Sequence, residues 1–113
     1  MSESVQHDLA AVLEHIQNQA ASDRVRVTQH AQQEMVEESY TLDEVLDTIA
    51  AAQIIENYPE HRRGPCCLLA GHTGAGRPVH VVCTTAHSEL ILITVYEPGP
   101  PKWITPTQRR RRR

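Results

Sequence analysis

The chain has 113 residues, of which 14 are acidic and 11 are basic, and its formal net charge is -3. No apolar run approaches the roughly 20 residues of a membrane-spanning helix, and aromatic residues make up only 4%, which excludes an extended base-stacking platform. The three cysteines do not form a disulfide framework and the acidic, polar N-terminus is no signal peptide, so we expect a cytoplasmic protein that does not enter a membrane.

The charges are divided unevenly along the chain. Residues 1–60 carry twelve acidic and two basic residues, a net charge of -10, whereas residues 61–113 carry nine basic and two acidic residues, a net charge of +7. Such asymmetry indicates either an end that binds a polyanion or an acidic half that binds a basic partner.

The N-terminal part has the sequence pattern of three helices. Between residues 5 and 21, apolar side chains recur with the spacing of one helical face. Residues 25–27 alternate briefly, and Thr28 can then cap a short second helix. Thr41 and Glu44 form a capping box, which predicts the start of a third helix.

After Ala52 the pattern becomes that of β-strands. The predicted strands cover residues 53–58, 66–70, 79–83 and 90–96. Short connections between successive strands favour an antiparallel meander. The predicted fold is therefore α+β, with N-terminal helices packed on one face of a three- to four-stranded antiparallel sheet, in a single domain at residues 1–104.

The C-terminal residues 105–113 are predicted to form a disordered tail rich in arginine. Prolines before and within this segment make it extended and non-helical. By default such a run is a solvated charged tail, and its functional interpretation is non-specific, salt-dependent attraction to nucleic-acid phosphates. The candidate nucleic-acid-binding residues are Arg109, Arg110, Arg111, Arg112 and Arg113.

Four polar residues are candidates for catalysis, namely His30, Arg77, His80 and Tyr96. A histidine such as His80 inside a hydrophobic strand costs free energy unless it is hydrogen-bonded or functional. Cleavage of RNA through its 2′-hydroxyl needs a base, an acid and a cation, which histidine, tyrosine and arginine supply without metal. The alternative is that His80 is a satisfied core residue and Arg77 a solvated turn residue.

The cysteines and histidines do not have the spacing of a metal site. His80 and Cys83 are three residues apart on a predicted strand and therefore project to opposite faces. We accordingly predict neither a metal nor a cofactor, and we expect the cysteines to pack in the core. A metal-responsive regulator that uses His30, His80 and Cys83 is kept as a third hypothesis.

Several segments occur in the order and at the spacing of a known family. They are residues 28–31 with Met35, 42–49, 54–59, 76–82, 93–98 and 102–103. The Arg-Pro-x-His-Val-Val block at residues 77–82 and the Thr-Val-Tyr-x-Pro block at residues 94–98 are the most specific. Over about residues 25–103 the chain resembles the domain of unknown function 4258 family of small bacterial and archaeal proteins.

This resemblance implies a fold related to RelE/MqsR/BrnT-type toxins, with a helical N-terminal part against a small antiparallel sheet. Some members are encoded beside zinc-finger antitoxins, which implies a toxin role and a cognate antitoxin as partner. The chain departs from the family where Glu34 replaces an arginine and where Ser39 and Tyr40 replace a Gly-Ile or similar pair. The helix at residues 5–21 lies outside the matching region and is a candidate for homodimerisation or partner binding.

The leading hypothesis is a RelE/MqsR-type toxin-like domain that binds or cleaves RNA. In such an endoribonuclease His80 or His30 would be the base, Tyr96 the acid or positioning group, and Arg77 the phosphate clamp. The alternative is a non-enzymatic protein-interaction or regulatory module that docks a partner through a sheet edge or through the helix at residues 5–21. The sequence leaves open whether the protein is an enzyme.

Overall fold

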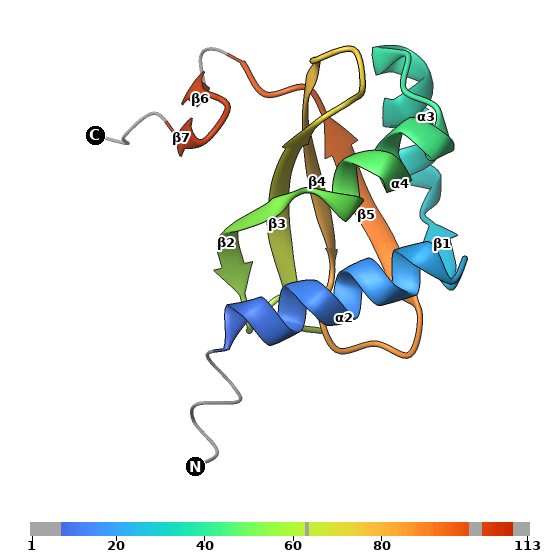
Figure 1. The fold of residues 1–113 in the computed structure, drawn as a ribbon, viewed down its shortest axis with the longest axis vertical. Coiled ribbons are helices and arrows are strands. Elements are labelled where there is room, and N and C mark those ends of the chain that lie inside the picture. The colour runs from blue at the N-terminus through green and yellow to red at the C-terminus, as the bar shows by residue number, and fades with distance from the viewer. Residues whose placement is uncertain (1–7, 63, 100–102, 110–113) are drawn as a thin grey trace.

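The computed structural model describes residues 8–62, 64–99 and 103–109, and Figure 1 shows their arrangement. The helices are α2 (Leu9–Ala21), α3 (Gln29–Glu38) and α4 (Leu42–Ala50). The strands are β1 (Val25–Val27), β2 (Gln53–Tyr58), β3 (Cys66–His72), β4 (Pro78–Thr84), β5 (Leu90–Tyr96), β6 (Trp103–Thr105) and β7 (Gln108–Arg109). The predicted α+β class is confirmed. Within the described ranges no helix has the length and apolar character needed to cross a bilayer.

Five of the strands form one mixed sheet in the order β1-β5-β4-β3-β2. The run from β2 to β5 is the predicted antiparallel meander. The prediction of three to four antiparallel strands missed β1, which lies parallel to β5 and pairs Val25 with Leu90 and Val27 with Leu92. Because β1 has only three residues and its partner lies far along the chain, no local pattern reveals this pairing.

The first helix begins later than the sequence pattern indicates. Asp8 is the N-cap of α2, and its carboxylate accepts a hydrogen bond from the Ala11 N–H at 3.1 Å. The predicted start at residue 5 therefore moves to Leu9, because a capping aspartate has non-helical backbone angles. Residues 5–7 of the prediction lie outside the described residues.

The other two helices begin at threonine caps, as predicted. Thr41 and Glu44 form the reciprocal capping box, with hydrogen bonds of 2.9 and 3.1 Å. The Thr28 hydroxyl accepts from the Ala31 N–H at 3.0 Å and donates to the Ile93 carbonyl of β5 at 3.1 Å. This second bond ties the start of α3 to the sheet.

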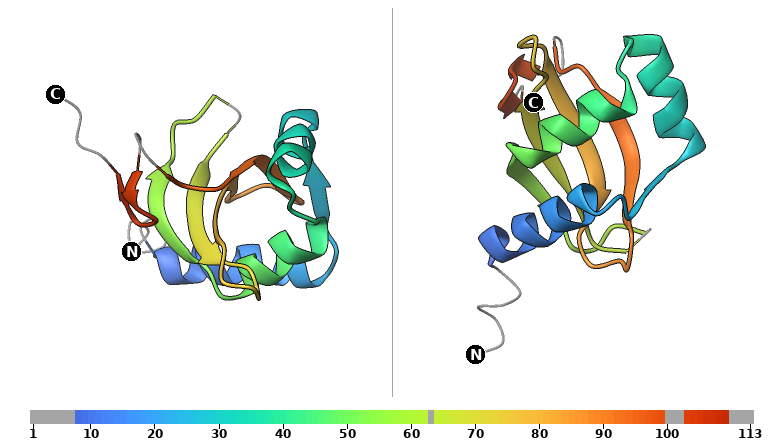
Figure 2. Two further views of the ribbon diagram at one scale, coloured as in Figure 1. Left: turned by 90° about the horizontal axis from the view of Figure 1, so that it is seen from above. Right: turned by 45° about the vertical axis from the view of Figure 1, so that its right-hand side comes forward.

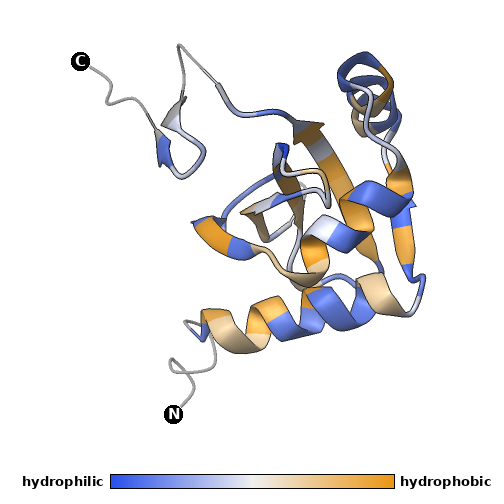
Figure 3. Ribbon diagram, turned by 45° about the horizontal axis from the view of Figure 1, so that its top comes forward, coloured by the Kyte–Doolittle hydropathy of each residue, from blue (hydrophilic) through white to orange (hydrophobic). Residues whose placement is uncertain are grey.

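The hydrophobic core lies between the helices and one face of the sheet. The helices contribute Ile16, Ala20, Ala31, Met35, Val45 and Ile49, and the strands contribute Cys67, Leu69, Val79, Val81, Cys83, Leu90, Leu92 and Val95. Figure 3 shows hydrophobic positions along β5 and an alternation of hydrophobic and hydrophilic positions along α2. The predicted packing of helices on one sheet face is therefore observed.

One glycine allows α4 to approach β3 closely. A Cβ atom on Gly71 would lie 2.7 Å from Thr48 Cγ2 and 3.4 Å from the Ala52 Cβ. The Thr48 hydroxyl donates to the carbonyls of Glu44 and His72 at 2.8 and 3.2 Å, so it links α4 to the end of β3. The contact needs a residue without a side chain at position 71.

The C-terminal residues form a short hairpin of β6 and β7. Trp103 pairs with Arg109 and Thr105 with Gln108. Figures 1 and 2 show the hairpin and α3 on opposite sides of the molecule. The predicted boundary between domain and tail at residue 104 falls within β6, and residues 110–113 of the predicted tail lie outside the described residues.

Candidate functional site

The side of the sheet that faces away from the helical core carries a group of polar and apolar side chains. Successive residues of a strand point to opposite faces, so the residues between the core positions point to this side. We call it the outer face and define it by Glu56, Tyr58, Cys66, Leu68, Ala70, His80 and Tyr96. Its centre is buried, since Leu68 and Ala70 are almost inaccessible although they lie outside the helix-side core.

His80 and Tyr96 form a hydrogen-bonded pair on the outer face. They stand opposite each other in the β4–β5 register, and 3.1 Å separates His80 Nδ1 from the Tyr96 hydroxyl oxygen. Their rings meet edge to face with centroids 5.2 Å apart. His80 is fully buried, and its Nε2 is in hydrogen-bond contact with the Pro106 carbonyl between β6 and β7.

These partners assign the hydrogen positions of the His80 ring. A carbonyl oxygen only accepts, so Nε2 carries the hydrogen that bonds Pro106. In the neutral ring Nδ1 is then the acceptor, and the Tyr96 hydroxyl donates to it. Tyr96 thus orients the imidazole, and the Nε2–H group is directed at the C-terminal hairpin.

A second tyrosine pair lies at the β2 side of the outer face. The Tyr58 hydroxyl donates to the Glu56 carboxylate. In the sheet register Tyr58 is opposite Cys66, and Glu56 is opposite Leu68. The outer face therefore has polar groups on β2 and on β4–β5, with apolar β3 residues between them.

Arg77 lies on the other side of the sheet, at the C-terminus of α3. Its guanidinium donates to the carbonyls of Glu38 and Ser39 at 2.8 and 3.3 Å and to the Glu97 carboxylate at 3.0 Å. The guanidinium also stacks 4.0 Å from the centroid of the Tyr40 ring. The hydrogen bond to Glu97 raises the pKa of Arg77 above its ordinary value. These contacts cap α3, where a cation is favoured by the helix dipole.

Tyr40 completes this contact between α3 and β4. Its hydroxyl donates to the Pro78 carbonyl at 2.8 Å, and burial raises its pKa to about 12 against the opposing effect of Arg77. Tyr40 was not among the candidate site residues predicted from the sequence. The sequence does contain an aromatic residue after α3 and an arginine before β4. Because these two residues are far apart along the chain, their contact could not be recognised from the sequence.

His30 lies on the exposed side of α3. Its Nε2 lies 3.3 Å from a Glu34 carboxylate oxygen, and 66% of its side chain is accessible. The other Glu34 oxygen accepts from the Val95 N–H of β5 at 2.8 Å. The structure therefore brings His80 and Tyr96 together but places His30 and Arg77 in separate contacts with α3.

A family model described as "Domain of unknown function (DUF4258)" matches residues 27–97, which is more than half of the chain. The chain belongs to the DUF4258 family. This confirms the resemblance, over slightly narrower limits than residues 25–103. Neither the curated proteins nor the solved structures contain a match.

The DUF4258 region contains His30, Arg77, His80 and Tyr96 but neither α2 nor the C-terminal hairpin. The structure describes two positions that depart from the family pattern. Glu34 accepts the Val95 N–H bond described above. Ser39 has a left-handed backbone with φ of 62°, a conformation that glycine adopts without strain.

The three thiols of the DUF4258 domain are buried and unpaired by disulfides. Cys67 and Cys83 face each other across β3 and β4 in the core, and Cys66 points to the outer face. Burial raises the pKa of Cys66 to about 11, and the hydrogen bond with Cys67 together with burial raises that of Cys83. Thiols with raised pKa values are poor nucleophiles. Among the described residues no group of three His, Cys, Asp or Glu side chains is placed to hold a metal ion.

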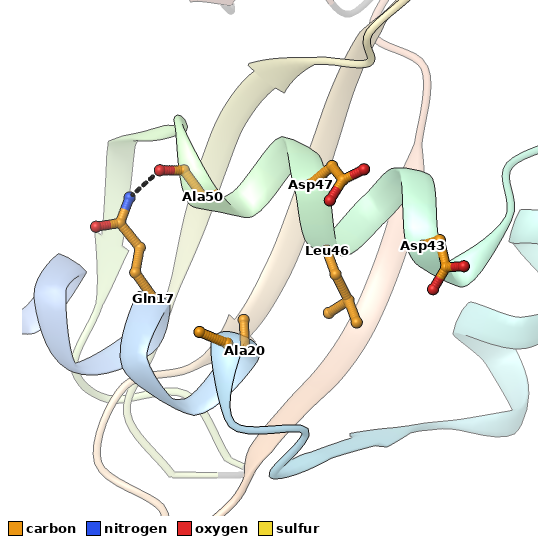
Figure 4. A pocket seen from close by; sticks show the side chains of 7 residues that line it. Gln17, Ala20, Asp43, Leu46, Asp47 and Ala50 are labelled. Atoms are coloured by element: carbon orange, nitrogen blue, oxygen red, sulfur yellow. Dashed lines mark hydrogen bonds between the residues drawn. The ribbon is translucent and has the colours of Figure 1, made fainter.

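A groove separates α2 from α4 on the helical side. Its volume is about 470 Å³, and it is lined by Gln17, Ala20, Ala21, Asp43, Leu46, Asp47 and Ala50. Figure 4 shows the Gln17 side chain reaching the C-terminus of α4, where its amide donates to the Ile49 and Ala50 carbonyls at 3.1 Å. The groove has an apolar floor and an acidic rim, and neither helix contains a lysine or arginine.

Proposed function

We propose that this DUF4258 protein is a toxin-like domain of RelE/MqsR type that binds RNA on its outer face. The observation that carries the proposal is the His80–Tyr96 pair. A histidine whose Nδ1 accepts from a tyrosine presents its Nε2–H as an oriented donor, and an oxygen of an RNA phosphate is an acceptor for such a donor. The run of arginines at residues 109–113 supplies non-specific attraction to the same polyanion.

The outer face supports this assignment better than the surroundings of Arg77. Arg77 already binds a carboxylate and two helix carbonyls, whereas the outer face combines polar side chains from three strands. His80 and Tyr96 also contain the two kinds of group needed to transfer protons at a ribose 2′-hydroxyl. We propose a cytoplasmic location for the protein and, as the family resemblance implies, an antitoxin as its partner.

The proposal is tested by RNA binding to the full chain. Fluorescein-labelled single-stranded RNA is titrated with the wild type, His80→Ala and Tyr96→Phe at about 50 mM and about 200 mM salt with EDTA present. Loss of a hydrogen bond to a charged oxygen weakens binding by roughly 10- to 100-fold, so both variants should show such a loss. Product analysis on a denaturing gel in the same samples tests metal-independent cleavage.

The control for these variants is His15→Ala, which removes an exposed histidine of α2 outside the outer face. It should bind RNA as the wild type does. Circular dichroism verifies that His80→Ala is folded, and Tyr96→Phe keeps the aromatic ring. If both outer-face variants bind RNA as tightly as the wild type, the RNA site is not on the outer face.

A second candidate function is protein interaction through the groove between α2 and α4, which is favoured by its acidic rim. Asp43 and Asp47 are exposed, and Leu46 lies between them on the same helix. An acidic groove of this kind complements a basic segment by charge. We propose the arginine run at residues 109–113 of a second copy as the occupant, which would make the protein a homodimer.

A further inference from the structure

The outer face is in contact with a part of the chain that lies beyond the family region. The DUF4258 match ends at residue 97, and the β6–β7 hairpin follows it. The Pro106 carbonyl of this hairpin accepts the hydrogen bond from His80 Nε2. The Nε2–H group of His80, which the proposed function assigns to RNA binding, is therefore hydrogen-bonded to the protein's own backbone.

The Pro106 carbonyl and a phosphate oxygen are chemically similar partners for His80. Both are oxygen acceptors, and either one satisfies the Nε2–H while Tyr96 satisfies Nδ1. A buried donor loses its partner only at a cost in free energy, so a ligand that replaces Pro106 must supply an equivalent acceptor. A phosphate oxygen meets this requirement.

The hairpin is short. Its paired strands contain three and two residues, and a two-stranded ribbon of this length is marginally stable in water. Thr105, Thr107 and Gln108 are exposed to solvent. Segments with exposed residues such as these are among those that open at low free-energy cost.

We propose that the β6–β7 hairpin is an intramolecular cap whose Pro106 carbonyl occupies the position of an RNA phosphate oxygen at His80. The proposal rests on the function proposed above and adds its regulation. RNA binds the open form, and the measured affinity is reduced by the fraction of molecules that are open. The cap also keeps His80 dry and paired when no RNA is present.

The test replaces residues 103–108 of the full chain with a Gly/Ser segment of equal length, which retains Arg109 and the arginines that follow. Long-range ¹H–¹⁵N spectra of histidine-labelled protein report the hydrogen exchange of His80 Nε2–H. Binding of fluorescein-labelled single-stranded RNA is measured in parallel on the same proteins. A control variant carries the same kind of replacement at residues 2–7.

We expect the Nε2–H of His80 to exchange faster in the hairpin variant than in the wild type and in the control. We also expect tighter RNA binding, by about tenfold if the cap is closed in about 90% of molecules. Equal RNA affinity of wild type and hairpin variant would overturn the cap. If exchange becomes faster but neither form binds RNA, the hairpin does cover His80 and the proposed RNA function is wrong.

Discussion

At the scale of single residues, the buried thiols make stability depend on pH. Cys66 has a pKa of about 11 in the folded protein against an ordinary value of 9.0, and the pKa of Cys83 is raised as well. As pH rises through this interval, the unfolded chain releases its thiol protons first. Proton release therefore favours unfolding, and the stabilisation present below pH 9 is lost as the pH approaches 11.

We therefore predict a free energy of unfolding that falls between pH 9 and 11. Urea denaturation under reducing conditions, repeated along a pH series, measures it. The Cys66→Ala variant should show a shallower fall but not a flat curve, because Cys83 retains its raised pKa. An unchanged wild-type value across this interval would show that the thiols do not differ between the two states.

Only part of the candidate site could be predicted from the sequence. The antiparallel pairing of the strands at residues 79–83 and 90–96 was predicted, and His80 and Tyr96 lie opposite each other in this pair. The contacts of Arg77 with Glu38 and Tyr40 could not be predicted, because they join residues far apart in the chain through the packing of α3 on β4. The role of Pro106 at His80 was missed for the same reason.

At the scale of elements, the approach of α4 to β3 depends on Gly71. The Gly71→Ala variant adds a methyl group 2.7 Å from Thr48 Cγ2, so the helix must move or the threonine must change rotamer. We predict a loss of about 1–3 kcal/mol in unfolding free energy, the usual cost of overpacking a core. Chemical denaturation with a fitted midpoint and slope measures this change.

The matched control for this prediction is Gly74→Ala, in the connection that follows β3. A Cβ atom there meets no atom within 4 Å, so stability should change by less than about 0.5 kcal/mol. The Thr48→Ser substitution removes the clashing methyl group, so the double variant with Gly71→Ala should recover part of the loss. Equal effects at Gly71 and Gly74 would rule out the steric explanation.

Local sequence signals predicted the elements better than their assembly. The threonine caps at Thr28 and Thr41 fixed the starts of two helices, because capping involves residues three positions apart. The parallel β1–β5 pairing and the β6–β7 hairpin were not predicted. Parallel pairing depends on a long connection, and a hairpin of so few residues has no recognisable hydrophobic alternation.

At the scale of the whole molecule, the uneven charge distribution follows the order of helices and strands along the chain. The acidic residues 1–60 include all three helices of the described chain, and the arginine run follows the sheet. If the arginines of one copy bind the groove between α2 and α4 of another, association is electrostatic and weakens with salt.

We predict concentration-dependent dimers at about 50 mM salt that dissociate at about 500 mM salt, measured by sedimentation equilibrium. The double variant Asp43→Asn/Asp47→Asn should remain monomeric. The control Glu37→Gln/Glu38→Gln removes the same charge from α3, outside the groove, and should dimerise as the wild type does. A monomeric wild type at low salt would exclude this interaction.

The pairing of β1 with β5 has a consequence for synthesis on the ribosome. Val25 leaves the exit tunnel long before its partner Leu90 has been translated. The parallel edge of the sheet therefore cannot close until nearly the whole family region has emerged, and α2–α4 must wait with their apolar faces unburied. During this interval the exposed apolar surface makes the nascent chain prone to aggregation and to chaperone binding.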